Sequence, residues 1–119
     1  MKILYLINTT PYGSNHNFEL IDSAMVSAIF DLEVSILFRK KGVLSLLQRQ
    51  NGNIIEGKTF SKVLAALSTY NIRNLYCCEE SMRDQRIKSS DLIEKVSSCS
   101  IEEQRLLISS QDTVISGSR

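Results

Sequence analysis

The residues with the clearest potential for chemistry are two adjacent cysteines, Cys77 and Cys78, which stand at the end of a predicted strand at 72–77. Because side chains alternate along a strand, the two thiols should point to opposite faces of a sheet. One of them then enters the core, and the other leaves at the end of the strand. A thiolate at such a strand end can attack a persulfide or disulfide sulfur. We therefore interpret Cys77 as a core residue and Cys78 as the candidate nucleophile.

Two opposing effects act on the Cys78 thiol in the sequence. A short helix is predicted over 79–85, and the positive end of its dipole favours a thiolate at Cys78. The adjacent carboxylates of Glu79–Glu80 disfavour a second negative charge nearby, although Arg83 and Arg86 could offset them. The pattern therefore leaves open both a reactive thiol and an inert, small apolar side chain, which is the commonest role of free cysteine.

Other candidate groups are weaker. Cys99 precedes a second predicted helix and is interpreted as structural. Three cysteines are an odd number, which argues against a disulfide framework in a reducing compartment. No CxxC pair occurs, and the only histidine, His16, is distant in sequence, so no metal site is expected. His16 itself is interpreted as a solvated or helix-capping residue.

A polar turn at residues 9–14 follows the first apolar run. Such a turn between a strand and a helix presents backbone N–H groups that can hold a phosphate. Pro11 removes one of those donors, and neither a GxGxxG nor a Walker pattern is present. A turn with a helix cap is the simpler interpretation, and a stand-alone flavin- or nucleotide-binding module stays open as an alternative.

The elements that must position these groups alternate along the chain. Strands are predicted at 3–7, 34–38, 72–77, 92–96 and 113–115. Helices are predicted at 17–30, 60–69 and 79–85 and after Ser100 to about Ser109, with a shorter helical segment at 43–47. Ser100 and Glu103 have the spacing of a capping box. This alternation predicts an α/β fold: a three-layer, doubly wound, mainly parallel sheet of about five strands.

Composition bounds the function. The 119 residues predict one domain over 1–119, with 43% apolar and 23% charged residues. A net charge of +1 gives no support for direct nucleic-acid binding. No apolar run reaches the length of a membrane span, and the apolar start is too short for a signal peptide, so a cytoplasmic protein is expected.

Several landmarks, taken in order, resemble the DsrE/DsrF/DsrH family and, within it, the TusC/DsrF branch. The similarity rests on order and spacing over nearly the whole chain. The landmarks are Pro11-Tyr12-Gly13, Phe38 with Gly42-Val43, Gln48 and Gln50, Tyr70-Asn71-Ile72, and Cys78-Glu79-Glu80-Ser81-Met82-Arg83. One departure is Arg86-Ile87, where the family pattern has a glycine after the helix.

This resemblance implies a flavodoxin-like fold without flavin or another cofactor, in a chain that is not catalytic by itself. It implies a subunit of a heterohexamer with TusB-like and TusD-like partners, which passes persulfide sulfur from TusA to TusE for 2-thiouridine formation at the tRNA wobble position. A DsrEFH-type role in sulfur oxidation is the alternative. The family's principal sulfur-carrying cysteine belongs to the TusD/DsrE subunit and lies at the end of the third strand, a position that Cys78 matches. An interaction-only subunit without thiol chemistry also stays open.

Overall fold

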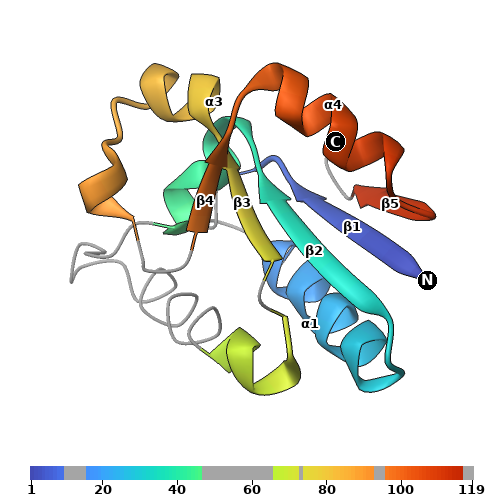
Figure 1. The fold of residues 1–119 in the computed structure, drawn as a ribbon. Helices are drawn as coiled ribbons and strands as arrows, with labels where there is room; N and C mark the ends of the chain where they lie inside the picture. Colours follow the sequence, from blue (N-terminus) through green and yellow to red (C-terminus); the bar gives the residue numbers. More distant parts are fainter. Residues whose placement is uncertain (10–15, 47–65, 73, 93–95, 117–119) are drawn as a thin grey trace.

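The computed structural model describes residues 1–9, 16–46, 66–72, 74–92 and 96–116 (Figure 1). Five parallel strands form one sheet in the order β4-β3-β2-β1-β5. The strands are β1 (Lys2–Ile7), β2 (Glu33–Phe38), β3 (Asn74–Cys78), β4 (Val96–Cys99) and β5 (Thr113–Ser116). The predicted α/β class is confirmed, while the strand order differs from the 2-1-3-4-5 order of flavodoxin.

Helical segments connect the strands. They are α1 (His16–Ile29), η1 (Lys40–Leu46), η2 (Leu67–Tyr70), α3 (Glu79–Asp84), η3 (Ser89–Asp91) and α4 (Ile101–Ser109), where η marks a 3-10 helix. The helix predicted at 60–69 lies mostly outside the described residues, and its last part is η2. Among the described residues, none of the helices has both the length and the apolar content that a membrane-crossing helix needs.

The sequence predicts the fourth strand at 92–96, of which residues 93–95 lie outside the described part of the chain. The described strand runs from Val96 through Ser97 and Ser98 to Cys99, so it continues beyond the predicted end. Within the described sheet β4 is an edge strand beside β3, and both serines are exposed. A continuous apolar run is typical of a strand that is covered on both faces. A polar edge strand has no such run, so its position is not predicted from hydrophobicity.

The direction of the connections places helices on both faces of the sheet. From β1 to β4 the chain moves to the next strand in one direction, and from β4 it returns across the sheet to β5 beside β1. Right-handed crossovers therefore put the early connections on one face and the last connection on the other. Accordingly, α1 and α4 lie on opposite sides of the sheet (Figure 1).

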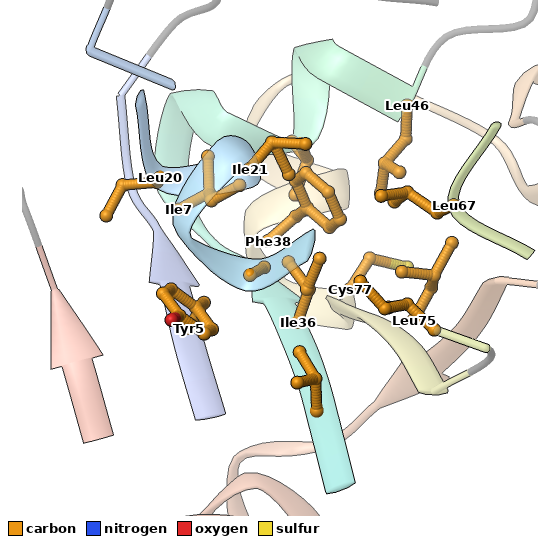
Figure 2. Close-up of a cluster of buried hydrophobic side chains, with 14 of the residues drawn as sticks. Tyr5, Ile7, Leu20, Ile21, Ile36, Phe38, Leu46, Leu67, Leu75 and Cys77 are labelled. Atoms are coloured by element: carbon orange, nitrogen blue, oxygen red, sulfur yellow. The ribbon is translucent and has the colours of Figure 1, made fainter. Parts of the chain in front are cut away.

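The first face carries the large core, in which α1, η1, η2 and α3 pack on the sheet. Figure 2 shows Phe38 of β2 and Cys77 of β3 in this core, with Leu46 and Leu67 nearby. Tyr5 is buried on the same face, and its hydroxyl lies 2.9 Å from both Ser23 Oγ and Ser27 Oγ of α1. These bonds satisfy a buried polar atom while its ring fills the core.

The second face carries the small core, which α4 alone covers among the described helices. Its buried members are Leu4, Leu6 and Leu37, and Tyr76, Leu107 and Ile108 pack against them. The two cores therefore differ greatly in size, although the same strands supply both.

A close approach between η1 and β1 explains one landmark of the family pattern. A Cβ atom at Gly42 would collide with the carbonyl oxygen of Ile7 at the end of β1. Only glycine leaves enough room for this contact. Val43, the next residue, is fully buried in the large core. Gly42 thus allows η1 to pack closely against the carboxyl end of β1, and Val43 anchors η1 in the large core.

The end of α3 explains the departure at Arg86. The Ile87 N–H donates to the Met82 carbonyl at 2.8 Å, and the Arg86 N–H donates to the Arg83 carbonyl at 3.1 Å. These two bonds form a Schellman ending, which requires a left-handed residue and usually has glycine there. Arg86 adopts this conformation with φ of 56°. The glycine-like backbone persists although the side chain has changed.

Candidate active site

The carboxyl edge between β3 and β4 is the point where the fold changes direction. The chain leaves β3 into α3, whose Met82 packs in the large core, and it leaves β4 into α4, which covers the small core. Figure 1 shows α3 and α4 diverging from neighbouring strand ends. In open parallel sheets, ligands and reactive groups gather at such a switch point. Cys78 ends β3 and Cys99 ends β4, so both thiols lie there.

At this edge Cys78 faces the α4 side of the sheet. Cys77 faces the large core, so Cys78, the next and last residue of β3, faces the other way. Cys99, the last residue of β4, pairs with Cys78. Asn8 directly follows β1 and Arg39 directly follows β2: Arg39 Nε donates to Asn8 Oδ1 at 3.0 Å, and Asn8 Nδ2 donates to Ser116 Oγ at 3.3 Å. The carboxyl edge of the sheet therefore carries a polar network after β1 and β2 and a thiol pair at the ends of β3 and β4.

Cys78 is the N-cap residue of α3, as the sequence predicted. Its Sγ accepts a hydrogen bond from the backbone N–H of Ser81 at 3.4 Å. The hydroxyl of Ser81 in turn accepts from the Lys40 N–H at 2.7 Å, which ties the first turn of α3 to η1. The thiol is therefore held in one orientation by two elements that lie far apart in the sequence.

The opposing effects on the Cys78 pKa are resolved by these hydrogen bonds. Burial raises the pKa, but donors from the Ser81 side chain and backbone, from Gln104 and from the Glu80 backbone together lower it below its ordinary value. Hydrogen bonds that stabilise the charged form of Cys78 thus outweigh the effect of its burial.

Gln104 is the site residue that sequence reasoning missed. It is the buried residue of α4 that faces the sheet. Its Nε2 donates to the Cys99 carbonyl at 3.0 Å, and its side chain also lowers the pKa of Cys78.

The predicted capping box at the start of α4 is confirmed: Ser100 caps α4 and bonds reciprocally with Glu103. That cap sets where α4 begins and hence where Gln104 lies, so a polar residue just after a capping box was the available signal.

Cys77 is confirmed as a core residue. It is fully buried in the large core, and its Sγ–H donates to Met82 Sδ at 3.3 Å (Figure 2 shows Cys77). Burial, followed by the nearby Cys99, Cys78 and Glu79, raises its pKa to about 12. Such a thiol stays protonated near neutral pH and is a poor nucleophile.

Cys99 precedes α4, as predicted, and it is also the last residue of β4, where it lies beside Cys78. It is 6% exposed, and Cys78 is 4% exposed. Burial, together with Glu103, Cys78 and Glu79, raises the pKa of Cys99. The pair therefore combines a thiol that favours the thiolate with one that favours the protonated form.

Two further candidates fall largely outside the described residues. The turn at 9–14 lies outside them except for Thr9. His16 begins α1, and its side chain is not described. Within the described ranges, no cluster of three or more His, Cys, Asp or Glu side chains is arranged to hold a metal ion.

Comparison with known proteins now gives the class of this chain. Residues 1–116 match the DsrE/DsrF-like family, so the chain belongs to that family. The intracellular sulfur oxidation protein DsrF of Allochromatium vinosum is 31% identical over 93 residues, which cover 78% of this chain and 68% of DsrF.

A TusC homologue of Haemophilus influenzae is 28% identical over 95 residues, which cover 78% of this chain and 80% of the homologue. The crystal structure of YchN from E. coli covers 98% of both chains, with a TM-score of 0.77 and 20% identity, and supports the fold. The resemblance to the TusC/DsrF branch is therefore confirmed.

Proposed function

We propose that this chain is a single-domain, cytoplasmic subunit of a TusBCD-type sulfur-relay complex. In this role it assembles with TusB-like and TusD-like subunits into a heterohexamer, which receives persulfide sulfur from TusA and passes it to TusE. The sulfur then serves 2-thiouridine formation at the tRNA wobble position. Similarity to proteins named TusC and DsrF supports the class of function. The observation that carries the chemistry is Cys78, a strand-end thiol with a lowered pKa that caps α3.

Sulfur transfer at Cys78 is a displacement between thiols. The Cys78 thiolate attacks the outer, sulfane sulfur of a donor persulfide, a new S–S bond forms, and the donor cysteine leaves as its thiolate. A thiolate of the acceptor protein then takes the same sulfur from Cys78 by the reverse step. No electrons are gained or lost overall, so neither a flavin nor a metal is needed. The donors from Ser81 and Gln104 stabilise the Cys78 thiolate both before attack and when it leaves.

Exposed apolar side chains support an assembled state. Val26, Ile29 and Phe30 near the end of α1 are 53%, 63% and 72% exposed, and Leu106 on α4 is 72% exposed. Large apolar side chains gathered at a helix end are costly in water and are typical of surfaces that bind another protein. The subunit role therefore has support that does not depend on Cys78.

Co-expression with candidate TusB-like and TusD-like subunits tests the assembly. We expect one stable complex that contains all three chains. Replacing Phe30 and Ile29 by serine should weaken it, whereas replacing the exposed Arg105 by serine serves as a surface control. A chain that stays monomeric at micromolar concentration beside both partners would contradict the proposed assembly.

Loading the complex with a persulfide donor and mapping modified cysteines by mass spectrometry tests the chemistry. Cys78 should gain one sulfur atom, and a Cys77→Ala variant should gain it equally. Modification of a partner subunit alone would assign Cys78 a structural role and leave this chain as an assembly partner.

The similarity to DsrF favours one second candidate, a DsrEFH-type subunit of sulfur oxidation. The same cysteine chemistry would serve both pathways. Genes for a dissimilatory sulfite reductase beside this one would favour sulfur oxidation. Loss of tRNA 2-thiolation on deletion of the gene would favour the TusBCD-type role.

A further inference from the structure

We infer that Cys99 is a resolving thiol for Cys78: the two close to a disulfide, and this closure expels the sulfur of a Cys78 persulfide as hydrogen sulfide. The persulfide step rests on the proposed function, whereas the pairing of the two thiols rests on the fold alone. The sequence interpretation of Cys99 as structural is thereby revised.

Strand register is the first observation. Cys78 and Cys99 are direct partners in the parallel pairing of β3 and β4. Adjacent strands lie about 4.8 Å apart, which is inside the Cα separation of roughly 4.4–6.8 Å that a disulfide spans. Residues in register on parallel strands point to the same face, so both thiols lie on the α4 side. Cys77 pairs instead with Ser98 on the other face.

The position of the pair at the strand ends is the second observation. Both residues are the last of their strands, where the chain turns away into α3 and α4. A small approach of the two Cβ atoms there disturbs no further strand pairing. Gln104 contacts the site from α4 through the Cys99 carbonyl and the Cys78 thiol. The pair is thus a built arrangement of three side chains at the switch point of the sheet.

The charge state of the pair suits the reaction. Burial, then the Glu103 carboxylate and then the charge of Cys78 raise the pKa of Cys99, so Cys99 stays protonated while Cys78 is a thiolate. Cys78 acquires the sulfur and thereby loses its thiolate charge, which removes that contribution to the raised pKa of Cys99 before the second step. The Cys99 proton is then available to the leaving group.

The closing step balances as follows. Cys99 Sγ attacks Cys78 Sγ, the bond from Cys78 Sγ to the outer sulfur breaks, and its electron pair leaves with hydrosulfide. The Cys99 proton ends on hydrosulfide and gives hydrogen sulfide. The outer sulfur is reduced by two electrons, and the two cysteine sulfurs are oxidised to the disulfide. No additional oxidant is required.

Oxidation with diamide tests the pairing without any persulfide. The N=N bond of diamide accepts two electrons and two protons as the disulfide forms. We expect peptide mapping of the purified chain to find a Cys78–Cys99 disulfide in the parent protein and in the Cys77→Ala variant. It should be absent from Cys99→Ala and from Cys99→Ser, two variants that guard against a folding defect in either one. A Cys77–Cys78 disulfide, or only intermolecular disulfides, would overturn the inference.

Loading with inorganic polysulfide tests the expulsion step. Cys78 should first gain sulfur, and hydrogen sulfide should then be released. Cys99→Ala should slow that release at least about tenfold, because an intramolecular thiol greatly exceeds a dissolved one in effective concentration. Equal release from Cys99→Ala and Cys77→Ala would overturn the expulsion step. If Cys78 never gains sulfur in any variant, the proposed carrier role fails, while the diamide result still decides the pairing.

Discussion

Cys77 and Cys78 are chemically identical neighbours that the sheet separates into different environments. Cys77 enters the large core, where its sulfur contacts Met82 Sδ and burial raises its pKa to about 12. Cys78 faces the α4 side, where hydrogen-bond donors lower its pKa although it too is buried. The difference shows that burial alone does not make a thiol inert. What matters is whether polar donors replace the water that burial removes.

The largest effect is expected when the same two faces of the sheet are compared through their apolar cores. Ile36 and Leu37 are adjacent, equally buried residues of β2 that face the large and the small core. Ile36→Ala should lower the free energy of unfolding by about 4 kcal/mol and Leu37→Ala by about 2.5 kcal/mol, because the small core can collapse more easily around a cavity. Urea unfolding with unchanged m-values measures both. Equal losses, or a reversed order, would show that the two faces are packed alike.

The next largest effect is expected in the alkylation rates of Cys77 and Cys78. At pH 8, a larger fraction of Cys78 than of Cys77 is thiolate, because hydrogen-bond donors outweigh burial and lower the pKa of Cys78, whereas burial raises that of Cys77 to about 12. A thiolate of higher pKa is intrinsically more nucleophilic, which narrows the difference, so Cys78 should react with iodoacetamide faster than Cys77 by roughly tenfold or more. Variants that retain only one of the two cysteines give the rates separately.

The pH profiles sharpen the same comparison. The Cys78 rate should reach half its maximum below pH 9, because its folded-state pKa is lowered from 9.0. The Cys77 rate should reach half its maximum only near pH 12. Profiles that coincide would mean that both thiols react only after unfolding.

A smaller effect is expected at Gln104. Gln104→Met keeps the volume of the side chain but removes the donor to Cys78, so the pKa of Cys78 should rise. Alkylation of Cys78 at neutral pH should slow about fivefold, because the loss of roughly 1.5 kcal/mol of hydrogen bonding to the thiolate is partly offset by the greater nucleophilicity of a thiolate of higher pKa. Gln111→Met, beyond the end of α4, is a matched control that should leave the rate unchanged. An unaltered rate in Gln104→Met would assign the lowering to α3 alone.

The smallest effect lies at the far end of α3. Arg86→Gly should raise the free energy of unfolding by roughly 0.5 kcal/mol, because relief of the left-handed strain slightly exceeds the added entropy of glycine in the unfolded chain. Thermal unfolding measures the gain, and Cys78 alkylation should not change. A loss of stability would show that the Arg86 side chain stabilises the turn by a contact of its own.

Much of this site could be predicted from local pattern. Alternation along 72–77 correctly separated Cys77 from Cys78, and the capping box correctly placed the start of α4. The position of β4 could not be predicted, since Ser97 and Ser98 belong to an exposed sheet edge and carry no apolar signal. Gln104 was missed because its role depends on which strand end lies beneath α4.

The sequence by itself determined the alternation of strands and helices, the opposite directions of the two adjacent thiols, and the family. These are properties of residues close together in the chain, where periodicity and capping act. Only the tertiary structure decided that Cys99 lies beside Cys78 and that donors outweigh burial at the Cys78 sulfur. The reason is physical: parallel strands meet through long crossovers, so their register and the helix packed over them are set by the fold as a whole.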